Sequence, residues 1–179
     1  MFRPAHREEW PMVRPPENAR RIPYSYEIFD SDMYNISRAV RTHHSNIKFL
    51  YGIVNGAYTM IHRLHHLLGL LILQIDPLTT LAEIIRSGRA HGLADEEIEK
   101  QAKEWVSSVL ILDDFIDSGK TAQKYIEAGF TLATWFKLKE CPIEPAIWIR
   151  EKESLDVWIE APWEKDSVID KKESPSNDC

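Results

Sequence analysis

One segment near the middle of the chain constrains the fold more than any other. Four apolar residues at positions 109–112 are followed by two carboxylates, Asp113 and Asp114, and then by a short polar turn at 117–121. The apolar run predicts a strand that is buried on both faces, as in a parallel sheet. A helix over 121–128 is expected to follow the turn. This order predicts an α/β unit with polar groups at the carboxyl end of the strand.

The rest of the middle of the chain repeats this alternation of apolar runs and helical periodicity. A helical hairpin at 77–108 interrupts it, because two short amphipathic segments are separated by glycines there. The elements together predict an α/β fold with a mostly parallel sheet flanked by helices. Helices are expected over 32–43, 57–68, 79–108 as the hairpin, and 121–128, and strands over 49–54, 70–75, 109–112, 131–136, 146–149 and 157–159.

The two ends of the chain differ from the middle. Residues 1–23 carry five of the ten prolines, and each proline removes a backbone donor, so we expect an irregular arm there. Residues 170–179 are polar without an apolar pattern, which predicts a disordered tail. Residues 24–169 between them form one predicted domain, long enough to bury a core.

Composition excludes several classes of protein. The chain has 179 residues and a net charge of −6, and such an acidic balance argues against a nucleic-acid partner. No run of about 20 apolar residues occurs, so we expect no integral contact with a membrane. The two cysteines, Cys141 and Cys179, stand outside any paired motif. This usage is typical of a reducing compartment and predicts a cytoplasmic protein.

The polar groups that follow the strand 109–112 suit a phosphorylated sugar. Two adjacent acids, Asp113 and Asp114, are expensive to hold unless a cation or hydroxyl groups satisfy them. The turn 117–121 offers backbone N–H groups, two hydroxyls and a lysine at a helix N-terminus, which together favour an anion. The segment therefore predicts sugar hydroxyls or Mg²⁺ on one side and a phosphate on the other.

Other interpretations of these residues are weaker. A Walker A loop shares the ending Gly119-Lys120-Thr121, but its first glycine is replaced by Asp114, whose charge would repel the phosphates. A strand and a capped helix without any ligand is the second alternative, and the coincidence of an acid pair with a phosphate-type turn disfavours it. His62 and His66 lie four residues apart but lack the glutamate of a zinc-protease helix, so they indicate ordinary helix surface.

The segment 109–121 resembles the signature of type I phosphoribosyltransferases: an apolar strand, Asp-Asp, two apolar residues, then Asp-Ser/Thr-Gly-x-Thr. The resemblance implies that fold, with a small hood built from the C-terminal segment and the N-terminal strand. It also implies the donor 5-phosphoribosyl 1-diphosphate (PRPP) and Mg²⁺. Asp113 and Asp114 would meet the ribose hydroxyls, with Asp114 the metal contact, and Asp117 would be the catalytic acid or base at purine N7. The residues implied to hold the 5-phosphate are Ser118, Gly119, Lys120 and Thr121.

A second resemblance concerns the base. Residues 157–164 are similar to the Trp-Ile-Glu-x-Pro-Trp-Asp segment of bacterial xanthine-guanine phosphoribosyltransferases, which implies that Trp158 stacks on the purine and that Ile159 contacts it through the backbone. That family also has a lysine that donates to the 6-oxo group. Ungapped alignment from Trp158 places Lys139 there, and Lys137 on the same strand face is the alternative. A lysine suits a keto acceptor and not the amine of adenine.

The segment 52–57 lies where the family keeps its pyrophosphate turn. Asn55 and Gly56 would bind the donor there, although Asn55 replaces an arginine and Ala57 replaces a glycine. The hairpin 77–108 is our candidate for the lid that closes over the donor. Its Arg86 or Arg89 could supply the arginine that the family's mobile loop brings to pyrophosphate.

The sequence as a whole predicts an enzyme that transfers a phosphoribosyl group from PRPP to guanine, xanthine or hypoxanthine. It would act as a homo-oligomer, a dimer or tetramer. Two alternatives stay open. One is a non-catalytic sensor of a nucleotide or of PRPP, motivated by the changes at Asn55 and Ala57, and the other is a phosphoribosyltransferase for an acceptor other than a purine.

Overall fold

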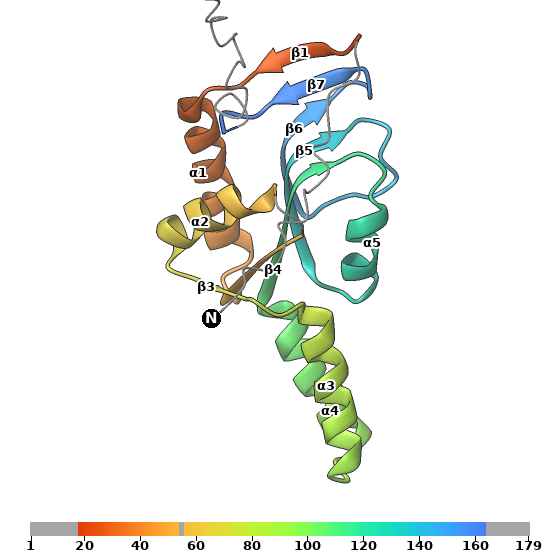
Figure 1. Ribbon diagram of the computed structural model, residues 1–179. Coiled ribbons are helices and arrows are strands. Elements are labelled where there is room, and N and C mark those ends of the chain that lie inside the picture. Colours follow the sequence, from red (N-terminus) through yellow and green to blue (C-terminus); the bar gives the residue numbers. More distant parts are fainter. Residues whose placement is uncertain (1–17, 54–55, 164–179) are drawn as a thin grey trace, which may run out of the picture.

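The computed structural model describes residues 18–53 and 56–163. Its centre is a five-stranded sheet in the order β3-β2-β4-β5-β6, with every neighbouring pair parallel (Figure 1). This confirms the predicted α/β fold. The strands are β2 (Phe49–Gly52), β3 (Leu71–Ile72), β4 (Val109–Ile116), β5 (Thr131–Leu138) and β6 (Ile147–Lys152).

Helices cover both faces of this sheet. Helices α1 (Tyr26–His43) and α2 (Ala57–Leu68) lie on one face, and α5 (Lys120–Glu127) lies on the other (Figure 1). The first half of β4 is buried on both sides, as the apolar run predicts. Because side chains alternate along a strand, Leu110 and Leu112 join the core under α1 and α2, whereas Val109 and Ile111 join the core under α5.

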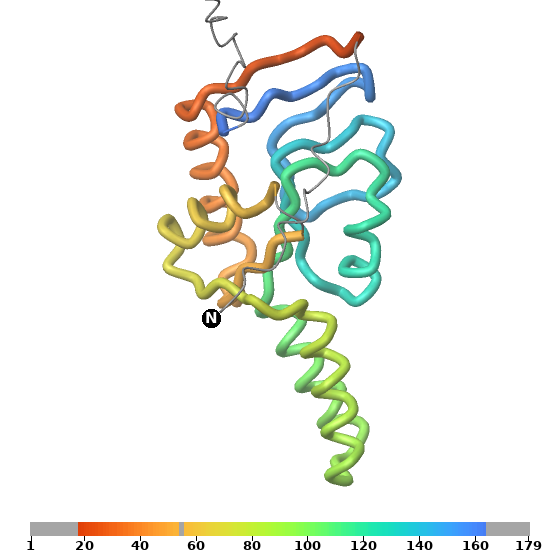
Figure 2. The backbone as a smooth tube through the Cα atoms, viewed as in Figure 1, coloured from red at the N-terminus to blue at the C-terminus, as the bar shows by residue number. Residues whose placement is uncertain are grey.

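Two short strands from opposite ends of the chain form a separate hood. β1 (Arg20–Pro23) pairs in parallel with β7 (Val157–Glu160), and the two lie side by side above the main sheet (Figure 2). The predicted hood is therefore present. The irregular arm was expected to reach residue 23, but residues 20–23 gain strand partners in β7. The rest of that arm at 1–17 and the expected tail at 170–179 lie outside the described residues.

Two predicted boundaries were wrong for local reasons. Helix α1 begins at Tyr26 and not at the predicted residue 32, because Ser25 caps it and accepts from the N–H of Ile28 at 3.3 Å. Strand β4 continues through the acid pair to Ile116, because β5 runs alongside it and supplies partners from Thr131 onward. The two carboxylates thus stand on a strand and not in a loop.

The predicted hairpin is confirmed as a helical pair. It consists of α3 (Pro77–Ala90) and α4 (Asp95–Ser107), and Gly88 allows close packing because a β-carbon there would lie 2.7 Å from Ile98. The pair leaves the sheet near the start of β4 and points away from the carboxyl ends of the strands (Figure 1). A lid would require a different placement of the hairpin, so that role stays a prediction.

A buried ion pair joins α1 to the sheet. The carboxylate of Asp32 is almost fully buried and accepts from Trp135 Nε1 at 2.8 Å and from Arg150 Nη2 at 2.9 Å. The guanidinium of Arg150 also lies over the ring of Tyr24, 5.2 Å from its centroid. The network links α1, β5 and β6 and fixes the helix on the sheet.

We expect Asp32→Ala to lower the free energy of unfolding by about 2–3 kcal/mol, because the buried indole N–H of Trp135 and the partly exposed guanidinium of Arg150 lose their acceptor. Urea unfolding measures this loss. Asp30→Ala is the matched control on the same helix, since Asp30 forms a half-exposed ion pair with Arg63 at 2.8 Å and should contribute less than about 1 kcal/mol. Equal losses in the two variants would contradict the assignment.

Candidate functional site

The polar residues of β4 lie where the sheet changes direction. From β2 the chain moves through α2 to the edge strand β3, and from β4 it moves through α5 to β5 on the other side. Ligands of open α/β sheets bind in the crevice at such a switch, beyond the carboxyl ends of the strands. The last residue of β2, Gly52, lies opposite Leu112, so Asp113 and Asp114 extend past β2 into that position.

The turn after β2 meets the acid pair at close range. A β-carbon built on Gly56 would lie 1.8 Å from Oδ2 of Asp114, so only glycine lets the backbone approach this carboxylate. Asp114 is held from its own strand as well, because Oδ1 accepts from the N–H of Phe115 at 3.1 Å. The structure thus brings two predicted donor-binding residues together. The neighbouring Asn55 lies outside the described residues.

Asp113 carries an unusual carboxyl group. It is only 9% exposed, and burial, followed by the negative charge of Asp114, raises its pKa to about 8. A carboxyl group in this state is protonated at neutral pH unless a cation or a set of hydroxyl donors favours its charged form. A bound cation or hydroxyl group would therefore favour the charged form of Asp113.

This raised pKa makes stability depend on pH. The folded state binds a proton at Asp113 that the unfolded chain, with a normal carboxyl pKa near 4, releases earlier. The stabilisation is complete below the unfolded pKa and is lost as the pH rises to about 8. Without ligand or metal, we expect Asp113→Asn to melt above the wild type at pH 8.5 and the difference to vanish near pH 4. A difference independent of pH, measured by thermal unfolding, would contradict this.

The turn after β4 forms a small pocket. It has a volume of about 160 Å³ and is lined by Asp113 and residues 115–122. Gly119 has a φ of +72° and a β-carbon there would lie 2.4 Å from Ile143, so both the backbone conformation and the packing require glycine. Helix α5 begins at Lys120 directly after this turn. The predicted phosphate residues Ser118, Lys120 and Thr121 thus surround one pocket at a helix N-terminus.

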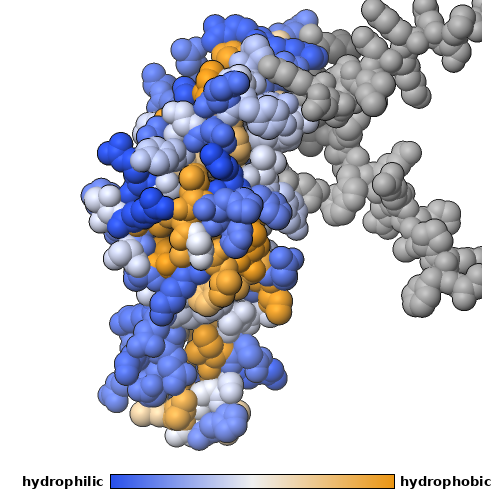
Figure 3. Space-filling view, turned by 90° about the vertical axis from the view of Figure 1, so that its left-hand side faces the viewer, coloured by the Kyte–Doolittle hydropathy of each residue, from blue (hydrophilic) through white to orange (hydrophobic). Residues whose placement is uncertain are grey.

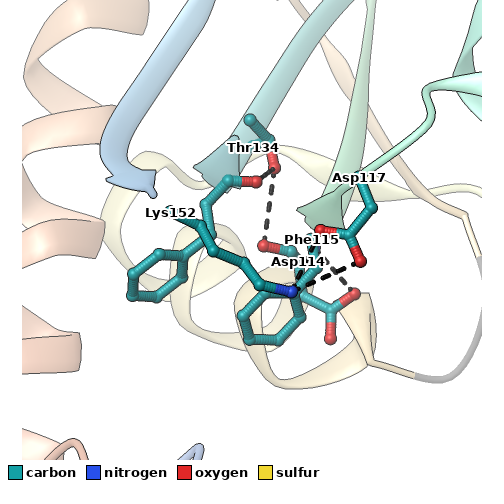
Figure 4. A network of polar contacts seen from close by, with 6 residues as sticks. Asp114, Phe115, Asp117, Thr134 and Lys152 are labelled. Atoms are coloured by element: carbon teal, nitrogen blue, oxygen red, sulfur yellow. Dashed lines mark hydrogen bonds and ion pairs between the residues drawn. The ribbon is translucent and has the colours of Figure 1, made fainter. Parts of the chain in front are cut away.

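Asp117, the predicted acid or base, has a partner that the sequence did not indicate. Lys152 reaches from the end of β6 to the carboxylate of Asp117, with Nζ–O distances of 3.2 and 3.5 Å (Figure 4). The strand predicted over 146–149 ended before Lys152, which left this lysine in a loop. The observed strand extends to Lys152 and carries it to the same edge of the sheet as Asp117.

The residues predicted to bind the base differ in their burial and in their contacts. Lys139 follows the last residue of β5 and has an exposed side chain. Lys137 is buried and is engaged by Glu144 in an ion pair. On β7, Ile159 faces the core and Trp158 is half-buried. The structure does not show Trp158 in contact with the acids of β4, so its stacking role stays a prediction.

Comparison with known proteins identifies this architecture. No family model matches the sequence, and no curated protein matches it. Among solved structures, Helicobacter pylori xanthine-guanine-hypoxanthine phosphoribosyltransferase matches with a TM-score of 0.57 and 17% identity, covering 83% of this chain and 96% of that one. The chain has the type I phosphoribosyltransferase fold. A purine phosphoribosyltransferase from Pyrococcus horikoshii Ot3 matches with a TM-score of 0.54 and 17% identity over 89% of this chain and 99% of that one.

A third solved structure has the same fold. It is a hypothetical protein from Neisseria gonorrhoeae with bound ppGpp, and it matches with a TM-score of 0.53 and 17% identity, covering 81% of this chain and 89% of that one. The type I phosphoribosyltransferase fold is thus found in this chain together with two transferases and one nucleotide-bound protein. At this identity the likeness establishes the fold.

The acid pair fits the magnesium that this fold implies. Mg²⁺ prefers carboxylate oxygens and commonly uses one or two of them together with oxygens of a phosphorylated substrate. Asp113 and Asp114 supply such oxygens, and because burial, followed by the charge of Asp114, raises the pKa of Asp113, a nearby cation would favour its charged form. Within 18–53 and 56–163, no cluster of three or more His, Cys, Asp or Glu side chains could hold a metal ion by itself. None of the helices in the described part of the chain could span a membrane.

Proposed function

We propose that the protein transfers a 5-phosphoribosyl group from PRPP to N9 of a 6-oxopurine. The products would be a nucleoside monophosphate and pyrophosphate. One observation carries the proposal: a close-approach glycine turn, an acid pair and a phosphate-sized pocket meet at the carboxyl ends of β2 and β4. These three parts correspond to the diphosphate, the ribose hydroxyls and the 5-phosphate of a single donor molecule.

Each part has a defined role in binding. Asp113 and Asp114 orient the ribose hydroxyls, because their carboxylates accept from two neighbouring O–H groups. The pocket at 118–121 holds the 5-phosphate through backbone N–H groups, hydroxyls and the charge of Lys120. Gly56 lets the diphosphate approach the backbone. Asp114 would hold Mg²⁺, which would supply positive charge to neutralise the departing pyrophosphate.

The reaction breaks the bond between C1 of the ribose and the diphosphate oxygen, and the electron pair leaves with pyrophosphate. N9 of the purine forms the new bond to C1, which passes through an oxocarbenium-like state. The purine then carries one proton too many, and the carboxylate of Asp117 accepts it from N7. Trp158 and a lysine at this edge of the sheet would position the base for this attack.

Pyrophosphate release tests the proposal. The protein is incubated with PRPP and Mg²⁺ and with guanine, xanthine, hypoxanthine, adenine or no base. We expect release that requires an oxopurine, with adenine giving at most a small fraction of that rate. Absence of release with every base would contradict the proposal.

A sensor of nucleotides is the second candidate. The ppGpp-bound Neisseria gonorrhoeae protein supports it, because that protein shares this fold. The replacement of the family's arginine by Asn55 supports it too. Weaker binding of pyrophosphate would impair a transferase but would leave the nucleotide binding of a sensor intact. A sensor would bind a purine nucleotide or PRPP without releasing pyrophosphate.

Assembly and location are part of the same proposal. Apolar side chains gather on the face formed by α1 and α2 (Figure 3), and Leu71 and Ile75, around β3, are each 63% exposed. Exposed apolar patches commonly mark interaction surfaces. This supports the predicted dimer or tetramer, which we place in the cytoplasm.

A further inference from the structure

A buried lysine at the end of β6 has no role in the interpretation given so far. The side chain of Lys152 is only 9% exposed, and its ammonium lies 3.2 Å from Oδ1 of Asp117. It crosses the carboxyl end of β5 to reach β4 (Figure 4). A buried ammonium has three N–H donors and needs acceptors. Among the described residues it meets the carboxylate of Asp117, which is 43% exposed, and this leaves donor capacity for a ligand.

The neighbouring lysines are disposed differently. Lys137 is engaged by the carboxylate of Glu144 and lies 5.5 Å from the centroid of the Trp148 ring, so its charge is directed toward the loop between β5 and β6. Lys139 has an exposed side chain, and its backbone N–H donates to the carbonyl of Lys152 at 2.9 Å. Of these three lysines, Lys152 is the one whose ammonium meets Asp117.

We propose that Lys152, and not Lys139, donates to the 6-oxo oxygen of the purine and sets the preference for oxopurines. This inference rests on the proposed function. Asp117 and Lys152 present an acceptor and a donor side by side. The N7–H and O6 groups of an oxopurine are likewise a donor and an acceptor on one edge, about 3 Å apart and within hydrogen-bond spacing.

The same pair disfavours adenine. Its exocyclic amine stands where O6 would be, so two donors would face each other at Lys152. A buried donor without an acceptor weakens binding more than the loss of a hydrogen bond in water does. This difference lets a site of this kind discriminate between bases. Lys152 would therefore act on the choice of base, whereas Asp117 acts on the proton.

The test compares Lys152→Met with Lys139→Met, two variants that remove one charge and keep a long side chain. The measured quantity is kcat/KM for pyrophosphate release with hypoxanthine and with adenine. In Lys152→Met we expect the hypoxanthine value to fall about 10- to 100-fold, with the adenine value much less affected. Lys139→Met should change the ratio less than about threefold. Lys152→Arg should restore part of the preference, because it returns a charged donor.

Two outcomes overturn the inference while the proposed function stands. In the first, Lys152→Met lowers kcat/KM equally for both bases, which would make it only a support for Asp117. In the second, Lys139→Met and not Lys152→Met loses the preference. If the wild type releases no pyrophosphate, the transferase proposal fails, and calorimetric binding of inosine and adenosine monophosphates then decides. A loss of the inosine preference in Lys152→Met supports the inference, and an unchanged preference overturns it.

Discussion

Replacement of Asp117 by asparagine is expected to lower pyrophosphate release by about 100- to 10,000-fold, the usual contribution of a general base. The amide has nearly the same shape as the carboxylate but cannot accept the purine proton. Steady-state rates with saturating PRPP and guanine measure the effect. A variant that retains wild-type turnover would exclude Asp117 from the proton transfer.

The same substitution separates an enzyme from a sensor. Asp117 forms an ion pair with Lys152 at 3.2 Å, but it is only one of several residues around the phosphate pocket. A sensor carrying Asp117→Asn should therefore keep most of its nucleotide affinity. Nucleotide binding measured by calorimetry, beside the rate, distinguishes loss of chemistry from loss of the site.

The buried lysine supplies the control for this experiment. Asp117→Asn leaves the ammonium of Lys152 without its carboxylate, which is expected to destabilise the fold. The double variant Asp117→Asn, Lys152→Met removes both charges and should recover stability without recovering turnover. If turnover rises with stability to the level of Lys152→Met alone, the single variant was inactive because it was damaged.

The core of the fold follows from local sequence signals. The run 109–112 predicts a strand buried on both faces, and all four residues are fully buried. Helix α2 was predicted with its observed limits, because Gly69 ends it in a left-handed conformation with a φ of +71°. Where a periodic apolar face and a glycine stop coincide, short-range information suffices.

Other features depend on pairing between distant segments. Arg20–Pro23 has the proline of an irregular arm, and only β7, more than a hundred residues away, makes it a strand. The edge strand β3 was expected over 70–75, but β2 offers partners only to Leu71–Ile72. Neither pairing partner is visible in the local sequence, so the boundaries could not be derived from it.

The candidate site divides in the same way. Its β4 part is contiguous in sequence, and Asp113, Asp114 and Asp117 were found because one motif contains them. Lys152 was missed, since its role depends on the parallel register of β5 and β6, which pairs it with Leu138. The signal that could have found it is a lysine at the end of a longer sixth strand, with apolar residues at 147 and 149.

Replacement of Gly56 by alanine is expected to remove most of the activity and to leave the fold intact. Gly56 has a φ of −62° and a ψ of −35°, which alanine adopts without strain. Its new methyl group would occupy the position of the Asp114 carboxylate, 1.8 Å from Oδ2. That carboxylate is the end of a side chain and can move away, so the free energy of unfolding should change by less than about 1 kcal/mol.

Under the proposed function, the displaced carboxylate could no longer meet the ribose hydroxyls or hold Mg²⁺. A shift of about 1 Å in such a group costs on the order of 100-fold in rate, so we expect pyrophosphate release to fall at least that far. Gly69→Ala is the matched control, because Gly69 has a φ of +71° and no atoms within 4 Å of the new methyl group. It should lose stability through backbone strain and keep its activity.

A double-mutant cycle decides whether the loss acts through Asp114. If Gly56→Ala works only by moving this carboxylate, then combining it with Asp114→Ala should lower the rate no further than Asp114→Ala does alone. Fully additive losses would mean that the methyl group obstructs the diphosphate directly. That result would leave Gly56 in the binding turn but would separate its contribution from that of the acid pair.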